Sequence, residues 1–115
     1  MRPSTAYKVL TADQMVALER DGCFAGAPVD LADGYIHLST ADQLRESIDK
    51  HFAGQTDLQL VAVDLDAVPG AVKWEPSRGG QLFPHLYGAI TLDIVTAYSP
   101  LAYEPDGSIR LPVTG

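Results

Sequence analysis

The stretch LQLVAVDL, residues 58–65, indicates the fold class. It is rich in β-branched residues and nearly continuous in apolar character, which is typical of a strand in the centre of a sheet. Pro69 and Gly70 then indicate a turn, and residues 72–75 beyond it form the next predicted strand. We therefore expect a sheet built around residues 58–65.

Two helices are predicted before that strand. Thr11 and Gln14 have the spacing of a capping box at the start of the first helix, and Gly22 is its expected end. Thr40 and Gln43 have the same spacing at the start of the second helix. Their apolar faces consist of Met15, Val16 and Leu18 in the first helix and Leu44, Ile48 and Phe52 in the second.

The other segments complete a small α+β domain. Further strands are predicted at 7–10, 35–38, 94–103 and 108–111, the last after a hairpin turn at Asp106 and Gly107. The Gly- and Pro-rich stretches 23–34 and 76–88 show no sustained period and are interpreted as loops, the second packed over the sheet. The order predicts one domain over residues 1–115, with two main helices and a mixed, mostly antiparallel sheet.

Charge and composition restrict the partners. Eight Lys and Arg residues against 15 Asp and Glu residues give a net charge of −7, which repels nucleic acid and anionic membrane surfaces. With one cysteine, Cys23, and no signal-like N-terminus, we expect a reduced cytoplasmic protein in which Cys23 is a small buried apolar residue. Prolines at 100, 105 and 112 discourage edge pairing and favour a monomer.

The motif GYIHLST, residues 34–40, contains the first candidate site. Alternation along a strand places Tyr35, His37 and Ser39 on one face, while Ile36 and Leu38 point to the other. His37 is then either a site residue or an ordinary strand histidine whose ring is satisfied by a neighbouring group.

The motif WEPSRGGQLFPHLYG, residues 74–88, contains the second candidate site. Trp74, Glu75, Arg78, His85 and Tyr87 supply aromatic surface for stacking and charged groups for a small anionic or ring-bearing ligand. Glu75 could act as an acid, a base or an anchor for a ligand hydroxyl, or could form a surface ion pair with Arg78.

Two other kinds of site are not supported. No two histidines among His37, His51 and His85 have the short spacing of a recognisable ligand pair, so we expect no metal, and His51 is interpreted as a cation at a helix C-terminus. The sequence has no GxSxG motif for a serine hydrolase and no glycine-rich phosphate loop.

The motifs YKVLT, DGYIHLSTADQL, HFAG and WEPSRGGQLFPHLYG together resemble a bacterial and plant family called domain of unknown function nine-fifty-two. Its fold is similar to the ADP-ribosyltransferase superfamily, whose strands split around a cleft for nicotinamide dinucleotide. The resemblance implies NAD, or an ADP-ribose-like ligand, as substrate. Within that pattern His37 and Ser39 match the middle element, whereas AYKVLT has Tyr7 and Lys8 where a typical member has His or Arg.

Three hypotheses follow: ADP-ribosyl transfer or NAD glycohydrolysis, a non-catalytic ligand-binding or interaction module, and a purely structural polar cluster. Under the first, His37 holds the ribose or diphosphate and Glu75 stabilises positive charge on the sugar. The expected catalytic residues are His37, Glu75 and His85. The expected ligand-binding residues are Tyr7, Lys8, Tyr35, Ser39, Thr40, Trp74, Arg78 and Tyr87.

Overall fold

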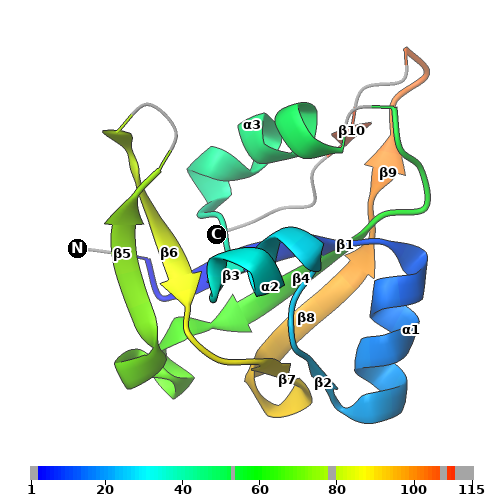
Figure 1. Ribbon diagram of the computed structural model, residues 1–115. Helices are drawn as coiled ribbons and strands as arrows, with labels where there is room; N and C mark the ends of the chain where they lie inside the picture. The colour runs from blue at the N-terminus through cyan, green and yellow to red at the C-terminus, as the bar shows by residue number, and fades with distance from the viewer. Residues whose placement is uncertain (1–2, 53, 78–79, 107–108, 111–115) are drawn as a thin grey trace.

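The computed structural model describes residues 3–52, 54–77, 80–106 and 109–110 (Figure 1). These residues form three α-helices: α1 (Ala12–Asp21), α2 (Pro28–Asp33) and α3 (Ala41–His51). The longer strands are β1 (Thr5–Leu10), β4 (Gln59–Asp64), β5 (Val72–Pro76), β6 (Leu82–Leu86) and β8 (Val95–Pro100). The two-residue strands are β2 (Cys23–Phe24), β3 (Ile36–His37), β7 (Ile90–Thr91), β9 (Ala102–Tyr103) and β10 (Ile109–Arg110).

Two three-stranded sheets form the framework. One has the order β1-β4-β8 and the other β3-β6-β5, and the described strand pairs are antiparallel in both. A bridge between Tyr7 and Ser39 joins them, because each backbone N–H donates to the other residue's carbonyl, at 2.8 Å and 2.9 Å. The bridge fixes β1 of the first sheet beside the segment that follows β3 of the second.

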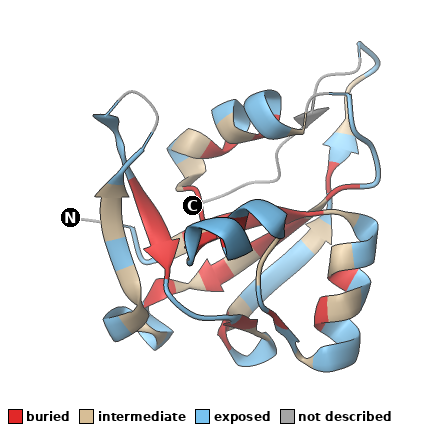
Figure 2. Ribbon diagram, in the orientation of Figure 1, coloured by how far each residue is buried: buried red, intermediate tan, exposed pale blue. Residues whose placement is uncertain are grey.

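Strands β1 and β4 of the first sheet are covered on both faces. Val61 and Val63 pack into one core cluster together with Leu18 of α1, whereas Leu60 packs into a second cluster with Leu44 and Ile48 of α3. Figure 2 shows buried residues in β4 and β6, whereas β8 of the first sheet is intermediate or exposed along its length. This two-sided burial is the reason that residues 58–65 are almost continuously apolar, and it confirms their predicted central position.

The predicted helices are confirmed by their caps. Thr11 Oγ1 accepts from the Gln14 N–H at 3.2 Å and Gln14 Oε1 accepts from the Thr11 N–H at 2.9 Å, which closes the predicted capping box. Gly22 ends α1 in the left-handed conformation with φ +75°. At the start of α3, Gln43 Oε1 accepts from the Thr40 N–H at 3.0 Å.

Two predicted loops were wrong. Residues 23–34 contain β2 and the short helix α2, and residues 76–88 contain β6, which is the central strand of the second sheet rather than a loop packed over it. Cys23 is exposed, not buried, because it lies on the outer face of β2. The predicted strand at 94–103 is divided into β8 and β9, and Gly107 of the predicted hairpin turn lies outside the described residues.

The α+β class with a mostly antiparallel sheet is confirmed. Within the described part of the chain, no helix has the length and apolar character needed to cross a membrane.

Candidate functional site

Asp30 is a buried carboxylate with four donors around it. It lies in α2 with a residue exposure of 1%. Lys8 Nζ lies 3.1 Å from Oδ1 and 2.9 Å from Oδ2, and the Ala27 N–H donates to Oδ2 at 2.8 Å. The His37 backbone N–H donates to Oδ1 at 3.0 Å, and Nδ1 of its ring lies 2.6 Å from the same oxygen. Asp30 therefore ties α2 to both β1 and β3.

The His37 ring lies between two carboxylates. Its Nδ1 contacts Asp30, and its Nε2 lies 3.0 Å from Asp33 Oδ2 on the next turn of α2. A neutral imidazole has one N–H, so both contacts are hydrogen bonds at the same time only when the ring is the imidazolium cation. The pKa of Asp30 is lowered: burial, the largest influence, raises it, but the charge of Lys8 and the hydrogen bonds from His37 outweigh burial.

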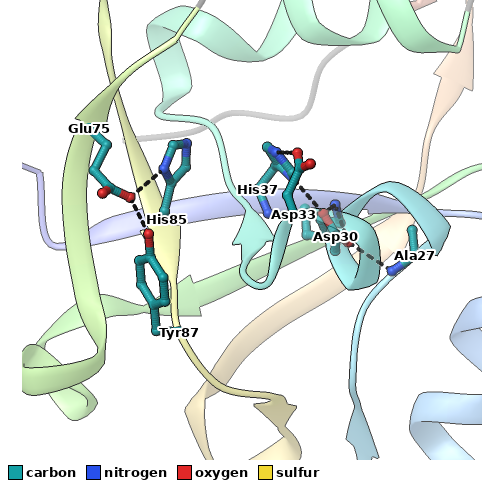
Figure 3. A network of polar contacts seen from close by, with 8 residues as sticks. Ala27, Asp30, Asp33, His37, Glu75, His85 and Tyr87 are labelled. Carbon is teal, nitrogen blue, oxygen red and sulfur yellow. Dashed lines mark hydrogen bonds and ion pairs between the residues drawn. The ribbon is translucent and has the colours of Figure 1, made fainter.

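The second group of side chains lies on β5 and β6. Glu75 Oε1 is 2.9 Å from His85 Nδ1 and accepts from the Tyr87 hydroxyl at 2.7 Å (Figure 3). Hydrogen bonds from Tyr87 and then from His85 lower the pKa of Glu75, and the bond to Glu75 raises the pKa of Tyr87 to about 12. Glu75 is thus an ionised acceptor, and His85 Nδ1 is its donor.

Strand alternation explains which side chains meet here. On β5, Trp74 packs against the main core, so Lys73 and Glu75 point to the opposite face. On β6, Leu86 is in the core, and His85 is directly opposite Lys73 on one side and His37 on the other. The predicted alternation in GYIHLST is confirmed as well, because Ile36 and Leu38 are both in the core.

Tyr35 joins the two groups. Its ring stacks on His85 with centroids 4.1 Å apart and lies 4.7 Å from the ring of His37 and 5.2 Å from that of Tyr87. The rings of His37 and His85 meet edge to face at 5.5 Å. Figure 3 shows both histidines between the carboxylate of Glu75 and those of Asp30 and Asp33. The pKa of Tyr35 is raised by burial first and then by the charges of Asp33 and Glu75.

A cavity of about 450 Å³ lies beside these residues. Its wall comes from β1, α1, the start of α2, β3, α3 and β6, the elements grouped around β1 in Figure 1. The volume is in the range of small-molecule sites. The apolar wall residues include Val9, Val29, Leu44, Phe52 and Phe83. The polar ones include Tyr7, Lys8, Gln14, His37, Ser39, Ser47, His51, Ser77 and His85.

His85 is a wall residue with a buried polar atom that has no partner among the described residues. The residue is 2% exposed, and its Nε2 is buried with no hydrogen-bond partner among the described residues. Glu75 holds Nδ1, so Nε2 lies across the ring from that bond. Most buried polar atoms in proteins have partners, and an unpaired one costs about 1–3 kcal/mol. Because His85 lines the cavity, a ligand atom is a natural partner for its Nε2.

The structure brings together part of the predicted site. Five of the predicted residues line the cavity: Tyr7, Lys8, His37, Ser39 and His85. Glu75, Tyr35 and Tyr87 are outside the wall but contact His85 directly or through Glu75. Trp74 packs on the core, Thr40 is the N-cap of α3, and Arg78 lies outside the described residues.

Sequence reasoning missed Asp30, Asp33 and Ser47. Ser47 Oγ lies 2.8 Å from Ser39 Oγ, between α3 and the segment after β3. A usable signal for Asp30 existed in APVDLADG, where Pro28 occupies the first helical turn, Asp30 reaches back to the Ala27 N–H, and Gly34 ends the helix. The described residues contain no group of three or more His, Cys, Asp or Glu side chains arranged to hold a metal ion.

Among solved structures, the chain is similar to protein CC0527 from Caulobacter crescentus. The crystal structure of protein CC0527 from Caulobacter crescentus superposes with a TM-score of 0.86, at 42% identity over 92% of this chain and 93% of that one. A double mutant of CC0527 gives the same TM-score at 40% identity over the same shares of the two chains. The solution NMR structure of CC0527 gives 0.81 at 42% identity, covering 92% of this chain and 91% of that one. No curated protein matches the chain.

The family comparison agrees with the sequence motifs. The matched region, residues 9–98, includes both motifs that contribute to the candidate site, all of the sheet β3-β6-β5, and β4 with parts of β1 and β8. The chain therefore belongs to the family described as protein of unknown function, DUF952.

Proposed function

We propose that the protein binds a small, nucleotide-like ligand of the NAD or ADP-ribose class in the cavity beside β1. The observation that carries the proposal is that His85, a residue of the cavity wall, has a buried Nε2 without a partner among the described residues. A bound ligand would satisfy it and remove the cost of leaving it unpaired.

The surroundings of His85 support a ligand with both apolar and polar parts. Phe83 and Val29 offer apolar surface, while Tyr7, Ser39 and Ser47 supply hydroxyl groups. A mostly apolar wall with a few polar groups is typical of small-molecule sites. The ring and the sugar hydroxyls of a nucleotide-like ligand match these two kinds of surface.

The arrangement of the strands supports the ADP-ribosyltransferase resemblance as part of this proposal. Two three-stranded sheets meet at the Tyr7–Ser39 bridge, and the cavity lies at this junction. A cleft between split sheets is the location that the resemblance implies for the dinucleotide. The resemblance is at the level of fold, so it indicates the ligand class rather than the reaction.

The occupied nitrogens of His37 favour binding over turnover. Both nitrogens contact carboxylates, and Glu75 already accepts from two donors. Two of the three predicted catalytic residues are therefore engaged with protein groups, which favours a module that binds its ligand without consuming it.

A two-dimensional amide NMR titration with NAD and ADP-ribose tests the proposal. We expect saturable shifts at Ser39, Phe83 and His85, and weaker binding by the His85→Gln variant. Tyr98→Phe is the control, because Tyr98 is half exposed on β8 outside the cavity wall and should leave binding unchanged. Absence of shifts in the wild-type protein at millimolar ligand would refute the proposal. Release of nicotinamide from NAD in the same samples would show turnover.

A further inference from the structure

We infer that His85 selects the ligand by accepting a hydrogen bond at Nε2, and that the ligand group it takes is a hydroxyl, such as that of a ribosyl unit. The inference rests on the proposed function and states which chemical group is recognised at the buried Nε2 of His85. Three features support the inference: the fixed orientation of the His85 ring, the position of its proton on Nδ1, and the charges around the cavity.

The orientation of the ring is fixed from three sides. Glu75 holds Nδ1 at 2.9 Å, the Tyr35 ring stacks on one face at 4.1 Å, and the His37 ring meets it at 5.5 Å. With a side-chain exposure of 3%, the ring has little room to turn. Nε2 therefore faces one fixed direction, and a ligand must place its own polar atom there to form a hydrogen bond.

Glu75 determines which ring nitrogen of His85 carries the proton. Its carboxylate is an acceptor, and it already accepts the Tyr87 hydroxyl, so the contact with His85 requires a proton on Nδ1. In the neutral ring, Nε2 then carries the lone pair and is an acceptor. A carboxylate that orients a histidine through Nδ1 and presents Nε2 to a ligand is a recurrent arrangement in binding and catalytic sites.

The charges of the wall favour a hydroxyl over an anion at this position. Lys8 is paired with Asp30, so the positive charge of Lys8 is balanced by a carboxylate, and the His37 ring lies between Asp30 and a second carboxylate, Asp33. Glu75 adds negative charge on the far side of His85. A phosphate group beside Nε2 would meet this negative surround, whereas an uncharged O–H donor satisfies the lone pair without a charge penalty.

The ligand class follows from these three features. The group at Nε2 donates an O–H, carries no charge, and belongs to a molecule small enough for the cavity of about 450 Å³. Ribosyl hydroxyls have these properties within the proposed class, and inorganic diphosphate lacks them.

The experiment is ¹⁵N-edited NMR of the histidine side chains in the full chain at neutral pH. The His85→Gln spectrum assigns the His85 signals among the three histidines. In the free wild-type protein we expect a proton on Nδ1 and none on Nε2. Saturation with ADP-ribose should move the Nε2 signal while Nδ1 keeps its proton, and inorganic diphosphate at the same concentration should leave Nε2 unchanged.

Two variants distinguish the effect of Glu75 on His85 from that of Tyr87. Glu75→Gln can donate from its amide to Nδ1 and so place the proton on Nε2, which should weaken ADP-ribose binding by about tenfold. Tyr87→Phe is the matched control, because it removes the other donor to Glu75 and leaves the Nδ1 contact intact; its affinity should stay within about twofold of wild type.

The outcomes distinguish this inference from the proposed function. If ADP-ribose and NAD fail to bind the wild-type protein, the proposed function falls and the inference falls with it. If ADP-ribose binds but Nε2 is protonated in the free protein, or its signal does not move at saturation, the inference alone is overturned. Binding of diphosphate at Nε2 as tight as that of ADP-ribose would overturn it too, because the recognised group would then be an anion.

Discussion

Replacing Asp30 with asparagine tests how much the contacts of this buried carboxylate, beside the cavity, stabilise the protein. Both carboxylate oxygens of Asp30 accept from N–H groups: Oδ1 from His37, and Oδ2 from Ala27, with Lys8 in contact with both. An asparagine of the same shape must place its NH₂ group against one of these donors in either orientation. Asp30→Asn therefore loses a charge and also creates a clash between donors.

The size of the effect follows from burial. The Asp30 side chain is 0% exposed and that of Lys8 10%, so the variant leaves a largely buried ammonium group without its partner. Breaking a buried ion pair in this way costs about 3–5 kcal/mol. A domain of ordinary stability has about 5–15 kcal/mol in total, so the loss should be large but compatible with folding at the upper end of that range.

Urea denaturation followed by the fluorescence of Trp74, the single tryptophan, measures the loss. Asp33→Asn is the matched control: Asp33 contacts the same histidine, but its side chain is 46% exposed, so its loss should be about 0–1 kcal/mol. A free energy of unfolding for Asp30→Asn within about 1 kcal/mol of wild type would refute the reasoning that Asp30 anchors α2 to β1 and β3.

The loss of stability in Asp30→Asn should also depend on pH in a definite direction. The pKa of Asp30 is lower in the folded protein than its ordinary value, so ionised Asp30 stabilises the fold. This contribution is fully present above the unfolded pKa, which is about 3.9, and is lost as the pH falls through the lower folded pKa. The stability difference between wild type and Asp30→Asn should therefore be constant near neutral pH and shrink below about pH 4.

Three further predictions come from other residues. Gly26→Ala should destabilise the protein by about 1–3 kcal/mol in urea denaturation, because Gly26 has φ +134° and a Cβ would lie 2.9 Å from Asp30 Cβ; Gly70→Ala, with open space at that position, should be nearly neutral. Glu75→Gln should return the pKa of Tyr87 from about 12 toward 10.0 in a ¹³C NMR titration, and an unchanged titration would contradict the Glu75 contact. In the wild-type protein, the stability that this contact contributes should be lost as the pH rises from about 10 to about 12. Cys23 should react with a thiol reagent in the native protein at the rate of an exposed cysteine, and protection until unfolding would contradict its exposure on β2.

The elements with strong local patterns were predictable from sequence. Residues 58–65 are buried on two faces and therefore carry an apolar pattern that a sequence alone reveals. The capping box at Thr11 and Gln14 is likewise a local interaction between residues three positions apart. Such features depend on the chain nearby rather than on distant partners.

The missed elements lack such patterns. Helix α2 has six residues, fewer than two turns, so no apolar period can develop, and Val29 and Leu31 are exposed on it. Strand β6 contains Pro84, which has no N–H and normally argues against a central strand. Its carbonyl still accepts from the Leu38 N–H at 3.1 Å, and pairing with β5 completes the strand.

The composition of the candidate site could be predicted only in part. His37, Ser39 and His85, which line the cavity, were candidates because histidines and hydroxyl residues in two unusual motifs are visible in the sequence. That Glu75 reaches His85 rather than the cavity depends on the register between β5 and β6, which no single-strand pattern specifies. Asp30 depends on a tertiary contact with Lys8, 22 positions away along the chain.

The buried polar residues are gathered in the region of the candidate site. Burying a polar or charged group is costly unless it is paired, so a fold built only for stability has little reason to gather such groups in one place. Among the described residues, the buried polar and charged side chains are those of Lys8, Asp30, Ser39 and His85. Three of them line the same cavity, and the fourth contacts Lys8. This convergence includes residues from both segments mistaken for loops, where the requirements of a polar site compete with the regular patterns that mark helices and strands.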